Sequence, residues 1–109
     1  MAHDPYASCI KACNECAAAC DHCSTACLAE QDVGMMARCI TLDMDCAQVC
    51  RLTAGVLARN SELARQVCAL CAEICKECAD ECARHMHDHC QECAQFCRFC
   101  AEECRKIAA

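Results

Sequence analysis

Cysteine is the residue whose number and spacing dominate this chain, because it makes up 19 of 109 residues. A thiolate is a soft metal ligand that selects Cu(I), zinc or iron–sulfur clusters. The cysteines fall into four groups, and within the groups most neighbours are separated by alternating steps of three and four residues. The groups are Cys9, Cys13, Cys16, Cys20, Cys23 and Cys27; Cys39, Cys46 and Cys50; Cys68, Cys71, Cys75, Cys78 and Cys82; and Cys90, Cys93, Cys97, Cys100 and Cys104. We expect all of them to be metal ligands, in many neighbouring sites.

The spacing of the cysteines predicts the elements that carry them. Steps of three and four keep side chains on one stripe of an α-helix, whereas a strand would turn every third residue to its other face. The four groups therefore predict four helices, over about 5–29, 33–56, 62–84 and 89–107. Short connections favour antiparallel neighbours. We predict an all-α protein in which residues 1–109 form a single domain, an up-down-up-down four-helix bundle with a Cys-lined core.

Polar residues with capping chemistry lie at the predicted helix starts. Asp4, Asp32 and Ser61 each precede a predicted helix, where a side-chain oxygen can accept a hydrogen bond from a free backbone N–H. Asp88 with Gln91 resembles a weak form of the capping box at the start of the fourth helix. Apolar residues beside the cysteine stripes are expected to pack the helices together: Leu42, Val49, Leu52 and Val56; Leu63, Val67, Leu70 and Ile74; and Phe96 and Phe99.

An acidic residue interrupts the cysteine stripe of the second predicted helix. Asp43 stands where the spacing calls for a thiol, and antiparallel stacking puts it in one layer with Cys20, Cys78 and Cys93. An unpaired buried carboxylate is costly. Two interpretations follow, a hydrated or capping carboxylate at the edge of the bundle, or a ligand or polar gate near one end of the thiol stripe.

One end of the bundle, formed by the connections near residues 29–36 and 84–89, differs from the rest. We call it the histidine end. Thioethers and imidazoles hold Cu(I) more weakly than buried thiolates do, which suits capture and transfer, so we predict that metal is loaded here. The alternative is that the histidines form a solvated turn, an interpretation that applies above all to His87. The candidate loading residues are His85, His87, His89, Asp43, Met35, Met36 and Met86, of which Met36, His85 and Met86 share the outermost layer with Cys27.

The remaining histidines and the opposite end of the bundle are expected to have no part in loading. His3 and His22 are predicted to be surface residues. The opposite end of the bundle is predicted to be closed by Tyr6, Thr53, Leu57 and Ile107.

Composition and charge exclude several classes of partner. A net charge of −6 disfavours nucleic acid, because phosphate binding needs a basic face. No window of about 18 apolar residues is present, so no membrane span is predicted, and the start of the chain lacks the features of an export signal. We therefore expect a cytoplasmic protein, whose thiols are kept reduced and bind metal rather than form disulfides.

Ligand chemistry favours Cu(I) as the metal. The cysteine run of bacterial ferredoxins is absent. A zinc ion bound by four thiolates adds a net charge of −2 relative to four thiols, and repeating such sites in a dry core accumulates charge. About one Cu(I) per cysteine replaces one proton each, so multiple Cu(I) ions add no net charge. The alternatives are a buffer for zinc or another soft metal, and a copper chaperone carrying one or two ions. A redox enzyme is not expected, because no cysteine is distinguished from the others.

Three motifs carry a resemblance to a known family. They are C-I-x-L-D-x-x-C from Cys39 to Cys46, C-A-L-C-A-x-I-C from Cys68 to Cys75, and H-x-H-D-H-C from His85 to Cys90. Together with the cysteine spacing over nearly the whole chain, they resemble the cytosolic bacterial copper storage proteins. The resemblance implies a homotetramer of four-helix bundles filled with Cu(I) bound mainly by cysteine, with the histidines and Asp43 near the loading end. We expect such a protein to sequester Cu(I) and to exchange it with a copper chaperone or acceptor protein.

Overall fold

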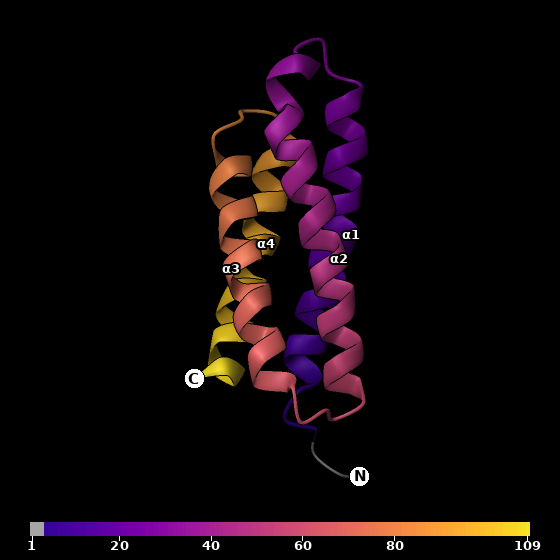
Figure 1. Cartoon of the computed structure of the whole chain (residues 1–109). Coiled ribbons are helices and arrows are strands. Elements are labelled where there is room, and N and C mark those ends of the chain that lie inside the picture. Colours follow the sequence, from indigo (N-terminus) through magenta and orange to yellow (C-terminus); the bar gives the residue numbers. More distant parts are fainter. Residues whose placement is uncertain (1–3) are drawn as a thin grey trace.

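The computed structural model describes residues 4–109, which form four long helices and one short 3-10 turn (Figure 1). Each long helix contacts its sequence neighbours, and the first also contacts the fourth. The predicted antiparallel four-helix bundle is therefore confirmed. The elements are α1 (Ala7–Leu28), η1 (Val33–Met36), α2 (Ala37–Ala58), α3 (Ala64–Ala83) and α4 (Asp88–Ala108).

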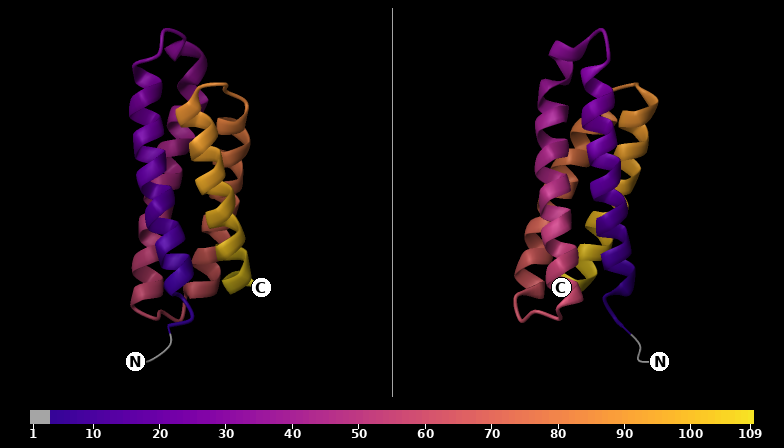
Figure 2. Two further views of the ribbon diagram at one scale, coloured as in Figure 1. Left: turned by 180° about the vertical axis from the view of Figure 1, so that it is seen from behind. Right: turned by 90° about the vertical axis from the view of Figure 1, so that its right-hand side faces the viewer.

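The two helical hairpins are not level with each other at the histidine end. The α1–α2 hairpin projects past the α3–α4 connection, as both views in Figure 2 show. The start of α1, the α2–α3 connection and the C-terminus share the opposite end of a molecule 49 Å long. The residues that follow α1 consequently lie beside the start of α4.

Several helix ends differ from the prediction in their capping contacts. Asp4 and Ser61 accept backbone N–H groups two residues later, at 2.8 and 3.1 Å. Asp32 makes no capping bond, and η1 rather than α2 follows it. The capping box predicted for Asp88 and Gln91 is wrong, because the Gln91 amide donates instead to the carbonyl oxygen of Ala83, the last residue of α3, at 3.1 Å and to that of His85, just after it, at 2.6 Å. Gln91 thereby ties the end of α3 to the start of α4.

Alanine is the residue that most often accompanies cysteine in the core. Among the predicted packing residues, Val49 and Val56 are buried, and Leu42, Val67 and Ile74 are partly buried. The remaining five are between 41% and 52% exposed, so the prediction that they pack the helices together is wrong for Leu52, Leu63, Leu70, Phe96 and Phe99. Small side chains beside the thiols allow close helix approach, which leaves the larger ones outside. The buried alanines are Ala12, Ala17, Ala47, Ala54, Ala64, Ala72, Ala79, Ala94 and Ala101.

The end opposite the histidines is closed as predicted. Thr53 and Leu57 are buried, and Tyr6 and Ile107 pack partly buried against the core. His22 is exposed, while His3 lies outside the described residues. Across residues 4–109, no helix combines the length and the apolar character needed to span a bilayer.

Candidate metal centre

All nineteen cysteines are free thiols whose side chains are buried along the axis of the bundle. The contacts between them confirm the register predicted from the spacing. In one layer, Cys46 Sγ lies 3.7 Å from that of Cys16 and 3.6 Å from that of Cys75, and Cys16 Sγ lies 3.7 Å from that of Cys97. One residue from each helix thus meets at the axis.

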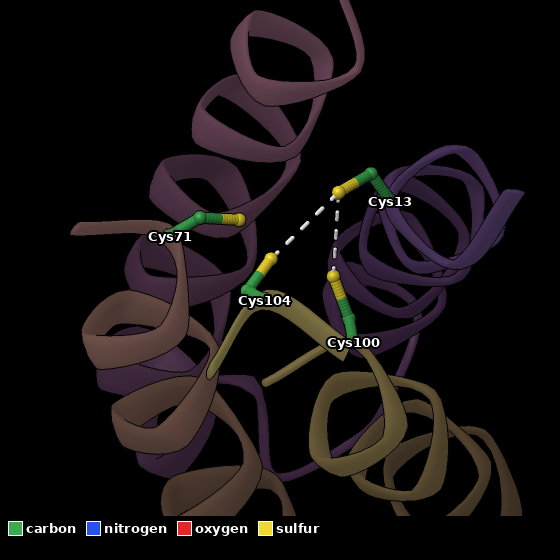
Figure 3. A group of neighbouring side chains, drawn as sticks. All are labelled: Cys13, Cys71, Cys100 and Cys104. Carbon is green, nitrogen blue, oxygen red and sulfur yellow. Dashed lines mark hydrogen bonds between the residues drawn. The ribbon is translucent and has the colours of Figure 1, made fainter. Parts of the chain in front are cut away.

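Groups of four sulfur atoms converge at several levels of this axis. Figure 3 shows one group, in which Cys13 of α1 faces Cys71 of α3 and Cys100 and Cys104 of α4. Its four sulfur atoms lie within 4.8 Å of one another, and Cys13 Sγ is 3.7 Å from Cys100 Sγ and 4.0 Å from Cys104 Sγ. The spacing is short enough for one soft cation to contact several sulfurs.

Neighbouring groups share members. Cys16, Cys20, Cys46 and Cys97 each belong to two of these four-sulfur groups. The axis is therefore a continuous row of potential ligands rather than a set of separate sites. Further groups are Cys16, Cys46, Cys50 and Cys75; Cys16, Cys20, Cys46 and Cys97; Cys20, Cys78, Cys93 and Cys97; and Cys23, Cys27, Cys39 and Cys90.

Two thiols, one near each end of the axis, hold their protons firmly. Burial raises the pKa of Cys27 to about 11 and that of Cys68 to about 12, since a thiolate is poorly solvated there. Cys27 lies near the histidine end, and Cys68 lies near the closed end. At neutral pH these two groups are neutral thiols. A metal cation that binds their thiolates must therefore displace the thiol protons.

Asp43 lies within the thiol axis and is completely buried. Its Oδ1 accepts hydrogen bonds from the thiols of Cys78, Cys82 and Cys93 at 3.2, 3.3 and 3.4 Å. This burial contradicts the interpretation of a hydrated carboxylate at the edge of the bundle. Burial raises the pKa of Asp43 to about 8, since a carboxylate is poorly solvated there. Asp43 therefore places a carboxyl group with a removable proton among side chains that otherwise offer sulfur.

The three histidines of the histidine end have different surroundings. His89 is 13% exposed, and its Nδ1 lies 3.5 Å from Cys90 Sγ and 3.6 Å from Cys23 Sγ. The Nε2 of His85 lies 2.7 Å from a carboxylate oxygen of the buried Glu81. His87 is the most exposed of the three, at 32%, and lies between two carboxylates. The structure thus brings one ring, that of His89, directly against the thiols.

The methionines do not gather as the sequence suggested. Met36 is fully buried, but Met35 and Met86 are 77% and 86% exposed. The position predicted for Met86 in the outermost layer is wrong, because it lies in the non-helical connection after α3, where the helical stripe does not continue. Sequence reasoning also missed Glu30 and Glu81 as partners of the histidines. The pairing of Glu81 with His85 could have been predicted, because the two residues are four positions apart. Glu30 comes from a turn that is distant in sequence.

The raised pKa of Asp43 predicts how the metal-free protein responds to pH. Because the folded pKa of about 8 exceeds the usual 3.8, this group favours the folded state fully below about pH 4, and the advantage is lost as pH rises to 8. We expect Asp43→Asn to gain stability relative to the unsubstituted protein by up to about 1.4 kcal/mol per pH unit over this range. Chemical denaturation of the reduced protein at several pH values measures the free energy of unfolding. The exposed Asp45→Asn is the control, and parallel pH profiles for all three proteins would contradict the expectation.

Comparison with known proteins agrees with this geometry. The family model for copper storage proteins matches residues 2–109. The cysteine-rich protein YhjQ of Bacillus subtilis is 47% identical over 102 residues, which cover 94% of each chain. The Cu(I)-bound copper storage protein BsCsp3 is 46% identical, with a TM-score of 0.93 over 96% of this chain and 99% of that one. A cytosolic copper storage protein from Streptomyces lividans, in a structure with five coppers, is 45% identical, with a TM-score of 0.92 over 95% of this chain and 92% of that one. The protein belongs to the copper storage protein family.

Proposed function

We propose that this protein stores Cu(I), binding many ions per chain through the thiolates of its nineteen cysteines. The observation that carries the proposal is the row of overlapping four-sulfur groups at the axis of the bundle. Shared sulfurs suit Cu(I), which needs two or three thiolates and accepts bridging ones. The Cu(I)-bound and copper-loaded relatives, which are about as long as this chain and have the same fold, support the same metal.

Charge balance supports monovalent copper over a divalent ion throughout the axis. When each Cu(I) displaces one thiol proton, the charge of the core is unchanged however many ions enter. When each zinc ion takes four thiolates, every filled site adds a charge of −2 in a low-dielectric interior. A store of many ions therefore favours Cu(I).

Zinc buffering is the second candidate, and one observation favours it. In a tetrahedral site with Zn–S bonds of about 2.3 Å, neighbouring sulfurs are about 3.8 Å apart. The sulfur–sulfur contacts across the axis fall in this range, from 3.5 Å between Cys39 and Cys82 to 4.0 Å between Cys13 and Cys104. A single zinc ion would fit one group, and filling overlapping groups would require cysteines that bridge two zinc ions. A chaperone for one or two ions would not require nineteen buried thiols.

Loading of copper at the histidine end is part of this proposal. His89 contacts the outermost thiols, and the buried Met36 lies at the same end. From there the route inward passes Asp43, which the thiols of α3 and α4 contact. Glu30 and Asp32 lie beside His87 at this end, and their negative charge attracts a cation. The candidate loading residues are His85, His87, His89, Asp43, Met35, Met36 and Met86. Met35 and Met86 are exposed and would act only from the surface.

The assembly, setting and partners of the protein are also proposals. The whole chain, 1–109, would act as one domain, in a homotetramer and without catalytic activity. Storage in the cytoplasm, as in the cytosolic Streptomyces protein, would keep the thiols reduced. A copper chaperone or an acceptor protein would supply or withdraw the ions.

A competitive titration tests storage directly. We expect the reduced protein, titrated anaerobically with Cu(I) against a chromophoric chelator, to bind on the order of one ion per cysteine. The helical circular dichroism should change little, because the thiols already converge in the metal-free fold. Saturation at one or two ions would indicate a chaperone instead, and retention of Zn²⁺ against equimolar Cu(I) would indicate a zinc buffer.

A triple variant tests the site of loading. His85→Ala, His87→Ala and His89→Ala together should slow Cu(I) uptake while leaving the final number of bound ions nearly unchanged, because the thiols hold the stored copper. Stopped-flow absorbance measures the rate, and His22→Ala on the exposed face of α1 is the matched control. A triple variant that fills at the rate of this control would eliminate the histidine end as the loading site.

A further inference from the structure

Two imidazoles at the start of α4 share one carboxylate oxygen. Oε2 of Glu30, in the turn after α1, lies 2.8 Å from His89 Nε2 and 3.2 Å from His87 Nδ1. The two rings stack, with centroids 5.4 Å apart and planes inclined by 3°. Glu30 lies in the connection between α1 and α2, at the end of the bundle where α4 begins (Figures 1 and 2).

The contact with Glu30 decides which nitrogen of His89 carries hydrogen. An ionised carboxylate only accepts hydrogen bonds, so Nε2 is the donor, and in the neutral ring Nδ1 then has the free lone pair. That lone pair faces the thiols, because Nδ1 lies 3.5, 3.6 and 3.9 Å from Cys90, Cys23 and Cys27 Sγ. A carboxylate that holds the outer N–H of a metal-binding histidine commonly fixes its tautomer and its ring orientation.

His87 lacks such a free nitrogen. Its Nδ1 faces Glu30, and its Nε2 lies 3.1 Å from Oδ1 of Asp32. With a carboxylate at each nitrogen, the ring offers no lone pair toward the thiols. His87 therefore stacks on His89 and lies on the outer side of Glu30, whereas His89 points a nitrogen inward.

We propose that Glu30 is a positioning residue, which holds His89 as the Nε2–H tautomer so that Nδ1 completes a preformed four-ligand acceptor for the first Cu(I) with Cys23, Cys27 and Cys90. The inference rests on the proposed storage of Cu(I), but the tautomer is a property of the metal-free protein. Glu30 touches no metal in this arrangement. It acts only through His89.

Nitrogen NMR of the reduced, metal-free protein tests the positioning. With ¹⁵N-labelled histidine at about pH 8, where ordinary imidazoles are neutral, long-range ¹H–¹⁵N spectra distinguish the two ring nitrogens. We expect protonated Nε2 and unprotonated Nδ1 at His89, and a mixture of tautomers in Glu30→Ala. Asp32→Ala, which removes only the second contact of His87, should leave His89 unchanged. An unchanged His89 spectrum in Glu30→Ala would overturn the proposal.

Copper binding by the same variants tests whether the orientation of His89 sets the affinity for the first Cu(I). Loss of a residue that orients a metal ligand costs about 10–100-fold in affinity, and we expect a loss of this size in Glu30→Ala for the first Cu(I) only. The total copper bound should stay the same. Glu30→Gln, whose carbonyl oxygen still accepts the Nε2–H, should recover most of the affinity, and Asp32→Ala should bind as the unsubstituted protein does.

The two proposals fail separately in this experiment. A shifted tautomer in Glu30→Ala with unchanged affinity for the first ion would overturn the role of Glu30 while leaving storage intact. An unsubstituted protein that binds only one or two Cu(I) ions would overturn storage, whatever the tautomer of His89.

Discussion

The exchange of a proton for a monovalent metal ion, inside a core made of thiols, is the interaction on which this structure depends. Buried charge is tolerated in proteins only when it is paired. A column of nineteen thiols meets this constraint in both states, because each group is neutral as a thiol and is compensated as a Cu(I) thiolate. The raised pKa values of Cys27 and Cys68 keep these two thiols in the first of these states at neutral pH.

The same constraint shapes the packing of the bundle. A core of sulfur and alanine brings the helices together without large apolar side chains, and several leucines and both phenylalanines remain on the outside. The axis then holds sulfurs 3.5–4.0 Å apart across helices while the thiols are still protonated. Copper can consequently fill sites that the fold has already assembled. The regular thiol layers are interrupted toward the histidine end, where the buried Asp43 and other polar groups take the place of thiols.

Periodicity was enough to predict the fold and the residues that converge at the axis. The three-four spacing predicted the helices, and antiparallel connectivity predicted the layers. The gap at Asp43 put a carboxylate in one layer with Cys20, Cys78 and Cys93, of which Cys78 and Cys93 contact it in the structure, while its contact with Cys82 was not predicted. That these residues bind metal remains a prediction.

The failures of the sequence prediction have a common cause. Met86 and Gln91 lie at or beside the α3–α4 connection, where helical periodicity stops and the path of the chain decides what each side chain meets. Glu30 meets His89 across 59 residues of sequence, a contact that local spacing does not encode. The exposure of Phe96 and Phe99 follows from how closely alanine lets the helices approach, a distance that a hydrophobic pattern does not encode.

Proton release during copper loading tests the central claim most directly. The reduced protein would be filled anaerobically in weakly buffered solution near neutral pH, with Cu(I) supplied as a complex that releases no protons, while a pH-stat counts the protons set free. Charge-neutral exchange requires that, at saturation, the protons released equal the copper ions bound. Markedly fewer protons than ions, or about two protons for every ion, would contradict the account, since the core would then gain charge as it fills.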